Sequence, residues 1–358
     1  MTPSHPHAPA AGLAPAQRAR APWRWTLAVL LAVLLPLAPL WAHAQWLPSS
    51  AEEQALDATA FQGMTDTIGE RFTGVQSVVV ALRGRIVYRY YRDGQPDTLR
   101  DVQSVQKSAV SALAGIALGQ GRLASLDQPV LALMPEWAAL NTDARAQDIT
   151  VRHLLTMSAG FAVDDPSGTK APGRPRDAWA RPMASAPGQS FAYDNALVPM
   201  LMAVLERAVG MPLADYAREQ LVAPLGMHEP SYQRGLQLRT EDMASLGQLF
   251  LQNGVWAGRQ IVPAAYVDAA TTPQMAGGLP VSLPYGYMWW VSSVKTPRRA
   301  FMAIGYGGQF IWVYPPTGLV IAATSTVPAR GPDRGQALQL IRNALFTAAQ
   351  KRSAGAER

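Results

Sequence analysis

The stretch Ser104-Val105-Gln106-Lys107 is followed by an apolar run, rich in Ala and Leu and free of Pro, that extends from residue 108 to residue 118. The run predicts a buried helix with Ser104 on its first turn. One helical turn separates Ser104 from Lys107, so their side chains share a face. A Ser hydroxyl beside a Lys amine pairs a nucleophile with a proton acceptor, and it indicates acyl transfer through a serine ester.

The start of a helix also suits this chemistry. Backbone amides at a helix N-terminus create a positive potential, which stabilises a developing alkoxide on Ser104. The same potential, together with partial desolvation, disfavours the ammonium form of Lys107. We therefore hypothesise that Lys107 takes the proton of the serine.

The spacing of Ser and Lys alone is a weak signal in this chain. Three of the four lysines follow a serine by three residues. The pair Ser167 and Lys170 lies in a segment crowded with Gly and Pro, which predicts a loop. The pair Ser292 and Lys295 precedes Thr-Pro and Arg-Arg, as expected between two strands. Only the copy at Ser104 opens a helix, and its alternative interpretation is an exposed Ser and Lys that cap an ordinary helix.

The N-terminus has the features of a secretory leader. Three arginines precede an apolar run over residues 25–40, and residues 42–44 read Ala-His-Ala. This pattern predicts a signal peptide over residues 1–44, with cleavage near Ala44/Gln45 and a periplasmic or secreted product. An uncleaved anchor is the alternative, but two prolines interrupt a run that is short for a membrane span.

Charge and cysteine content argue against a nucleic-acid partner, disulfides and a lipid anchor. Leader removal takes away three arginines and no acidic residue, so the net charge falls from +6 to +3. The remaining basic residues form no tract, so we expect no nucleic-acid partner. The absence of cysteine excludes disulfides and attachment through a lipidated N-terminal Cys, so we expect no stable membrane anchor after cleavage.

A histidine-based mechanism has little support. Beyond the leader the chain holds His153, within an apolar helical segment, and His228, at a predicted helix end. We expect structural roles for both. The sequence also lacks GxSxG, the nucleophile elbow of many Ser-His-Asp hydrolases. Two separate histidines without cysteine predict no metal site, and the sequence has no phosphate-binding loop and no GxGxxG that would predict a cofactor.

A second chemical segment is Tyr193-Asp194-Asn195. It follows a Pro-Gly turn and precedes an apolar helix predicted over about residues 197–208. A short fixed loop of this kind presents the phenol and the amide together. The phenol can relay a proton between serine and leaving group, and Asn195 can orient a lysine or bind a substrate amide. A purely structural Tyr is the alternative.

A third segment lies between two β-prone runs, residues 301–304 and 309–314. Its residues Gly305, Tyr306, Gly307 and Gly308 would let a substrate backbone approach closely. In the functional interpretation, an amide near Gln309 joins the amide of Ser104 in an oxyanion hole. A plain hairpin with a glycine bulge is the alternative.

Taken in this order, the three segments resemble the β-lactamase and penicillin-binding-protein superfamily of serine hydrolases. The resemblance is nearest to the class C β-lactamase-like branch, with its 6-aminohexanoate-dimer hydrolases and related esterases. It includes ITVRHLLTMSAGF at residues 149–161 and LVAPLGM at residues 221–227, and it covers about residues 60 to 348.

The resemblance implies an α/β (α+β) fold of the β-lactamase/transpeptidase type. An antiparallel sheet flanked by terminal helices would comprise residues 45–103 and 285–358. A mostly helical lobe, residues 104–284, would be inserted between its strands. The two lobes would form one catalytic domain with the active site between them.

The resemblance also implies roles for particular residues. Ser104 would be the nucleophile, Lys107 and Tyr193 the general base and proton relay in an order left open, and Asn195 a positioning group. Residues Tyr306 to Gln309 would form an edge strand that lines the cleft.

One departure bears on the substrate. Most β-lactamases and cell-wall transpeptidases begin the third segment with Lys and then Thr or Ser, where this chain has Tyr306 and Gly307. Loss of a buried cation that pairs with a carboxylate typically costs a few kcal/mol. The nearby Arg298, Arg299 and Arg330 are candidates to replace it.

The leading functional hypothesis is an exported serine hydrolase that cleaves a small-molecule amide or ester through a Ser104 acyl-enzyme, without cofactor or metal. One alternative is a β-lactamase or D,D-peptidase acting on β-lactams or cell-wall peptides. Another is an inactive binding or regulatory relative, against which the intact Ser104, Lys107 and Tyr193 argue.

Overall fold

Strands β2 (Val75–Leu82) and β3 (Arg85–Tyr91) form an antiparallel hairpin in the computed structural model. Arg83 and Gly84 connect them with φ values of 51° and 77°, the left-handed conformations of a two-residue hairpin turn. The apolar β2 is buried along nearly its whole length. It therefore lies inside the sheet, between β3 and the late strand β13 (Leu319–Ser325).

The structure describes residues 46–163, 165, 171–294, 298–327, 331 and 335–353, all within the compact unit formed by residues 41–358. The predicted leader over residues 1–44 lies outside the described residues. So do Ser167, Lys170, Lys295 and Arg330.

The main sheet has nine strands among the described residues, in the order β1-β3-β2-β13-β12-β11-β10-β9-β8. Its neighbours pair antiparallel, except β1 with β3. The other bounds are β1 (Leu47–Pro48), β8 (Met275–Gly278), β9 (Leu283–Tyr285), β10 (Trp290–Val291), β11 (Phe301–Gly305) and β12 (Gln309–Tyr314). Two short pairs accompany it: β4 (Arg100–Asp101) with β5 (Gln237–Leu238), and β6 (Val255–Trp256) with β7 (Arg259–Gln260).

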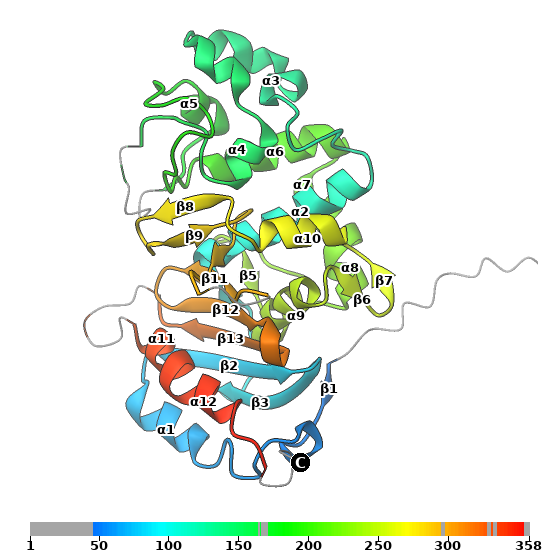
Figure 1. Ribbon diagram of the computed structural model, residues 1–358, viewed down its shortest axis with the longest axis vertical. Helices are drawn as coiled ribbons and strands as arrows, with labels where there is room; N and C mark the ends of the chain where they lie inside the picture. The colour runs from blue at the N-terminus through cyan, green and yellow to red at the C-terminus, as the bar shows by residue number, and fades with distance from the viewer. Residues whose placement is uncertain are drawn as a thin grey trace, which may run out of the picture. The chain divides into compact units, whose positions relative to one another are not determined.

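Terminal helices cover one face of this sheet (Figure 1). They are α1 (Met64–Arg71), α11 (Gln336–Leu340), the π-helical turn Ile341–Leu345 and α12 (Phe346–Ala348). Val78 and Val80 of β2 pack in the core on this side, whereas Val79 and Ala81 pack in the core on the other side. This alternation follows from the two-residue period of a strand, and it places the sheet between two apolar layers.

Helix α9 (Thr240–Leu251) packs directly on the opposite face. A Cβ at Gly247 would lie 2.6 Å from Ile311 Cγ2 and 2.9 Å from Val320 Cγ1, so only glycine allows this close approach. The predicted combination of an antiparallel-dominated sheet with helices is confirmed.

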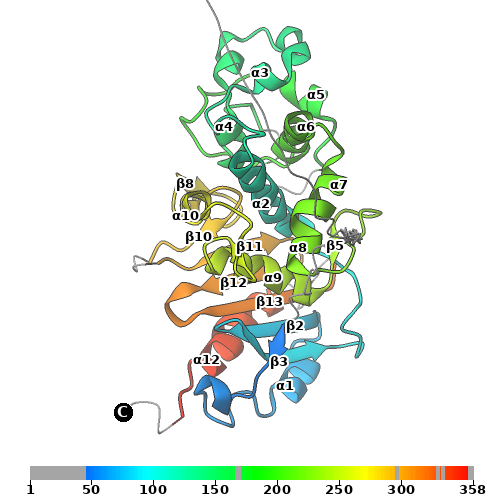
Figure 2. The same cartoon turned by 90° about the vertical axis from the view of Figure 1, so that its right-hand side faces the viewer.

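The remaining helices lie between β4 and β8 in the sequence. In space, α3 to α6 gather at one end of the unit (Figures 1 and 2). The sheet resumes at Met275, earlier than the expected boundary at residue 285. The helices are α2 (Gln106–Gly119), α3 (Val130–Leu133), α4 (Val151–Leu155), α5 (Pro175–Trp179), α6 (Leu197–Val209), α7 (Leu213–Ala217), α8 (Ala223–Leu225) and α10 (Ala264–Ala270). Shorter 3-10 or π turns are Glu52–Gln54, Gln103–Val105, Pro135–Leu140, Ala144–Asp148, Arg218–Val222 and Pro315–Thr317.

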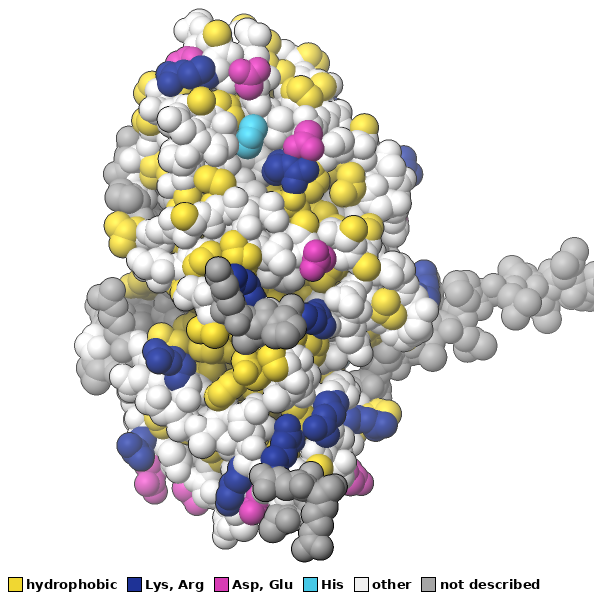
Figure 3. All heavy atoms as spheres, in the orientation of Figure 1, with side chains coloured by type: hydrophobic (Ala, Val, Ile, Leu, Met, Phe, Trp, Pro, Cys, Tyr) yellow, Lys and Arg dark blue, Asp and Glu magenta, His cyan; other side chains and the backbone are white. Residues whose placement is uncertain are grey.

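Within the described part of the chain, no single helix is long and apolar enough to cross a membrane. One pair, Leu197–Val209 with Leu213–Leu225, meets the length and composition criteria jointly but is bent by 77°. On the face drawn in Figure 3, Lys and Arg side chains are interspersed with Asp and Glu and with hydrophobic side chains.

Candidate active site

Ser104 lies on the 3-10 turn Gln103–Val105, which runs directly into α2. Gln103 has a φ of 49°, a left-handed conformation that costs a non-glycine residue roughly 1–2 kcal/mol. Asp101 compensates, because its carboxylate accepts hydrogen bonds from the Gln103 backbone amide at 2.8 Å and from Gln103 Nε2 at 2.6 Å. The position of Ser104 is therefore fixed by its own turn as well as by the helix.

Lys107 lies one turn further along and is only 6% exposed. Its Nζ donates to Ser104 Oγ at 2.9 Å and to Asn195 Oδ1 at 2.9 Å. The structure thus brings together Ser104, Lys107 and Asn195, although 88 residues separate the last two. A buried amine in contact with a serine hydroxyl is suited to exchange a proton with it.

Tyr193 lies between Lys107 and Trp290 of the sheet strand β10. Lys107 Nζ lies 4.9 Å from the centre of the Tyr193 ring, and the ring stacks on Trp290 at 5.7 Å. The Tyr193 hydroxyl forms no hydrogen bond with any described residue. Burial, with a smaller contribution from Tyr193, raises the pKa of the neighbouring Tyr285 well above its usual range. Tyr285 therefore stays a neutral phenol.

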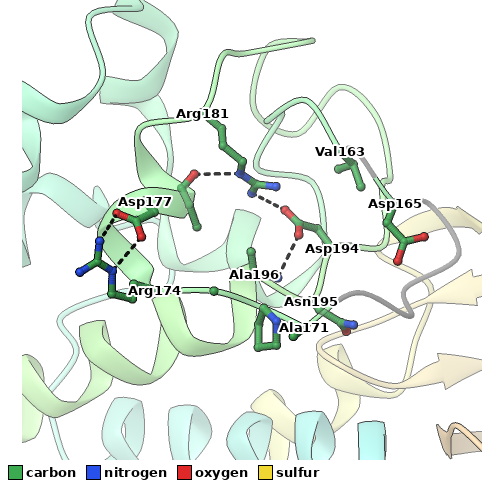
Figure 4. Close-up of a pocket in the computed structure, with 12 residues that line it drawn as sticks. Val163, Asp165, Ala171, Arg174, Asp177, Arg181, Asp194, Asn195 and Ala196 are labelled. Atoms are coloured by element: carbon green, nitrogen blue, oxygen red, sulfur yellow. Dashed lines mark hydrogen bonds and ion pairs between the residues drawn. The ribbon is translucent and has the colours of Figure 1, made fainter.

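An ion pair fixes the loop that carries Tyr193 and Asn195. The Asp194 carboxylate accepts a hydrogen bond from Arg181 and another, at 2.9 Å, from the Ala196 backbone amide. Figure 4 shows both contacts converging on Asp194, with Asn195 beside it. Asp194 is 6% exposed, so its charge depends on Arg181 for compensation.

The third predicted segment is a turn, and the expectation of an edge strand is wrong. Tyr306, Gly307 and Gly308 connect β11 to β12, both of which lie inside the sheet. The two glycines adopt φ values of 82° and 97°, which turn the chain back, and the Tyr306 side chain is 52% exposed. Gln309 is fully buried opposite Gly305 in the β11–β12 pairing.

The Gln309 side chain has a structural partner. Its Nε2 donates to the Ser325 carbonyl at 3.0 Å, and its Oε1 accepts from the Ser325 amide at 3.1 Å. This double contact joins the start of β12 to the end of β13. The Gln309 side chain is therefore bound to the backbone of β13, and it does not line the cavity beside Ser104.

Gly305 is the glycine that approaches the Ser104 turn, a contact that the sequence did not predict. A Cβ on Gly305 would lie 2.6 Å from the Val102 carbonyl oxygen and 3.0 Å from Gln103 Cβ. The end of β11 therefore lies against the turn that presents Ser104. The Gly-Tyr-Gly-Gly sequence indicates a close approach of the backbone, but it does not show which of the three glycines makes the contact.

A cavity of about 320 Å³ opens at Ser104. It is lined by Asp101, Gln103, Ser104, Gln106, Lys107, Pro172, Asn195, Val198, Pro199, Met202, Arg234, Gly235 and Leu236.

Arg234 is a lining residue that the sequence did not reveal. It is exposed and forms no ion pair with any described residue. In contrast, Arg298 donates to the Leu251 carbonyl and to Asn253, and Arg299 donates to two backbone carbonyls. These two arginines form structural hydrogen bonds and do not line the cavity at Ser104.

The histidines have structural surroundings. His153 Nδ1 accepts a hydrogen bond from the Thr150 backbone amide at 3.1 Å and completes a capping box at the start of α4. Burial lowers the pKa of His153. His228 lies 3.9 Å from Asp97 at the surface. The described residues contain no group of three or more His, Cys, Asp or Glu placed to hold a metal ion.

The sheet between helical layers and the contact of Ser104 with Lys107 are the features expected of a serine hydrolase of the beta-lactamase type. A model of the beta-lactamase family matches residues 50–237, more than half of the sequence. The chain belongs to this beta-lactamase family.

Relatives of this chain have different names. It is 30% identical over 208 residues to esterase EstB from Burkholderia gladioli, covering 49% of this chain and 52% of the esterase. It therefore matches about half the length of that relative. It is 23% identical over 347 residues to the 6-aminohexanoate-dimer hydrolase of Paenarthrobacter ureafaciens, covering 85% and 86% of the two chains. A penicillin-binding protein homologue from Caulobacter crescentus superposes with a TM-score of 0.66 and 17% identity, over 85% of this chain and 99% of the homologue.

Proposed function

We propose that this protein hydrolyses amide or ester bonds through a covalent acyl-enzyme on Ser104. The observation that carries the proposal is the contact between Ser104 Oγ and Lys107 Nζ, at 2.9 Å on a buried lysine. The same lysine is held by Asn195, so the amine is oriented before substrate arrives.

Ser104 Oγ attacks the substrate carbonyl carbon, and its proton passes to the pair formed by Lys107 and Tyr193. The Ser104 backbone amide and an amide at the end of β11 stabilise the resulting oxyanion. Collapse breaks the bond to the leaving group, which takes up the proton from the same pair. Water then attacks the acyl-serine, gives its proton to the pair and releases the acid, while Ser104 regains its hydrogen.

Uncharged amides and esters are the proposed substrates, as for a 6-aminohexanoate-dimer-hydrolase-like amidase or esterase. The turn carries Tyr306 and Gly307 where a carboxylate-binding cation and hydroxyl are usual. Arg298 and Arg299 do not reach the Ser104 cavity. Both observations weigh against substrates whose recognition depends on a carboxylate.

One observation favours a second candidate function. Arg234 lines the cavity and offers a cation to a substrate carboxylate. A β-lactamase or D,D-peptidase activity would use such a contact. Because Arg234 is exposed, its charge is screened by solvent, and we place this function second.

We also propose that the protein is exported and acts without a stable membrane anchor. The support is the N-terminal sequence, with three arginines, an apolar run and Ala-His-Ala before Gln45. Mass spectrometry of protein from the periplasm or medium should find a chain that begins at Gln45. A product found only in the cytoplasm with residues 1–44 intact would contradict export.

A fluorophosphonate probe tests the catalytic proposal. It should label the wild-type protein on the peptide that contains Ser104 and should not label Ser104→Ala. The matched control is Ser292→Ala, because Ser292 is also a serine three residues before a lysine, yet it lies outside the cavity. Labelling that persists in Ser104→Ala would overturn the assignment.

A further inference from the structure

A second cavity, of about 280 Å³, lies beside the one that opens at Ser104. Apart from Gln106 at one end, Glu206 and the phenol of Tyr232, its walls are apolar. The apolar residues that form them include Ala109, Val110, Leu113, Met202, Ala214 and Leu236.

The two cavities follow the same pair of helices. On α2, residues 106, 109, 110 and 113 share one face, which begins next to the turn of Ser104. On α6, Val198 lines the cavity at Ser104, Met202 lines both, and Glu206 lines the apolar one. The cavities are therefore successive sections of one groove between α2 and α6.

Three residues belong to both cavities: Gln106, Met202 and Leu236. Gln106 Nε2 contacts Met202 Sδ across the groove at 3.8 Å. Two of the three residues at the division between the sections, Gln106 and Met202, are therefore long, unbranched side chains in contact with each other. Such side chains change rotamer without movement of the backbone, and Met adapts readily to a ligand.

We propose that the apolar cavity binds the acyl chain of an ester substrate, with the Gln106–Met202 contact as its entrance. This inference rests on the proposed Ser104 acyl-enzyme. The leaving group must receive its proton from Lys107 and Tyr193, so it lies on their side of Ser104. Lys107 lines only the section at Ser104 and Tyr193 lines neither section, so the acyl chain extends away from both side chains into the apolar section.

The size of the cavity sets the substrate class. Leu113 lies seven positions after Gln106 on α2, or roughly 10 Å along the helix axis at 1.5 Å per residue. An unbranched saturated acyl chain of medium length fits this distance. Because each buried methylene favours binding, kcat/KM should rise by about fourfold for each one that enters the cavity.

The chain-length profile of p-nitrophenyl esters tests the inference. With the acetate, butanoate and octanoate esters below their solubility limits, wild-type kcat/KM should be higher for octanoate than for acetate by at least about tenfold. A flat or falling profile, in a protein whose Ser104 is acylated by the acetate ester, would overturn the acyl-chain cavity. Absence of acylation on Ser104 by any ester would instead contradict the proposed function.

Two substitutions change the ratio of octanoate to acetate activity in opposite directions. Ala214→Phe places a ring in the cavity far from Ser104 and should lower the ratio at least about tenfold. Met202→Ala shortens one side of the entrance and should raise the ratio, a gain that misfolding cannot produce. Ala223→Phe is the control, because Ala223 is exposed on α8 and lines neither cavity, and its ratio should equal that of wild type.

An unchanged ratio in both Ala214→Phe and Met202→Ala would overturn the inference. A ratio lowered equally by Ala214→Phe and Ala223→Phe would do the same, because the effect would then not depend on the cavity.

Discussion

Lys107 Nζ contacts Ser104 Oγ and Asn195 Oδ1 at the same distance, 2.9 Å. The lysine is thereby held between the helix that carries the serine and the loop that precedes α6. In the proposed mechanism this one amine accepts the serine proton without help from a histidine. Tyr193 lies next to it, with its ring centre 4.9 Å from the amine.

Lys107→Ala and Tyr193→Phe should each slow acylation by roughly 10²- to 10⁴-fold, because each removes part of one proton path. The double variant should be little slower than the worse single one, since residues that act as a unit are not additive. Stopped-flow measurement of acylation checks this, with the exposed Lys351→Ala as control. Fully additive losses would show that the two side chains act independently.

Arg181→Ala should lower both stability and kcat. It leaves the buried Asp194 carboxylate without its cation, which costs about 3 kcal/mol or more. The loop of Tyr193 and Asn195 then loses its anchor. Urea unfolding and kcat should change together, whereas Arg174→Ala should change neither, because the Arg174–Asp177 pair is exposed. Equal effects of the two substitutions would contradict this role of Arg181.

Gly305→Ala should reduce kcat/KM more than it reduces stability. The added Cβ would lie 2.6 Å from the Val102 carbonyl oxygen, so the turn of Ser104 has to shift. Even a small shift of a nucleophile is costly in rate. Gly69→Ala is the control, because nothing lies within 4 Å of a Cβ there. Wild-type kinetics in a folded Gly305→Ala protein would show that β11 does not constrain Ser104.

Part of this arrangement can be predicted from the sequence. Ser104 and Lys107 are one helical turn apart, and the Pro-free run after them defines a buried helix, so local spacing determines this pair. Strand β2 is likewise visible as an apolar run. The contact of Lys107 with Asn195 joins residues distant in the sequence, and only the shared order of segments with a known family made it predictable.

The groove between α2 and α6 could not be predicted in this way. Its walls depend on how the segment around Arg234 and Leu236 packs over two helices, and no periodic pattern marks that segment. The third segment shows the same difficulty. Gly307 and Gly308 are the more conspicuous glycines, yet Gly305 makes the close approach, because register decides which residue faces the Ser104 turn.

His153 should make stability depend on pH without taking part in catalysis. Burial lowers its pKa in the folded state, so the unfolded chain binds the proton first as the pH falls. The stability contribution is therefore complete above the unfolded value of about 6.5 and is lost as the pH falls through the folded value. Urea unfolding from pH 8 to pH 5 should show a smaller loss for His153→Gln than for wild type. A stable His153→Gln protein without activity would support a histidine mechanism instead.

Short-chain esters or linear amides should be better substrates than penicillins and cephalosporins, because the turn after β11 lacks a carboxylate-binding cation. Tyr306→Lys should raise β-lactam acylation relative to ester hydrolysis. Position 307 is best left as glycine, since its φ of 82° disfavours a side chain. Efficient wild-type cephalosporin hydrolysis, at rates matching the best ester, would favour the β-lactamase alternative.

The central claim is that Ser104 carries the acyl group during turnover. Acid quenching of the protein during turnover of an activated ester, followed by mass spectrometry, tests it directly. The account predicts a mass increase equal to one acyl group, located on the peptide that contains Ser104 and absent from Ser104→Ala. An acyl group on any other residue, or continued turnover by Ser104→Ala, would contradict it.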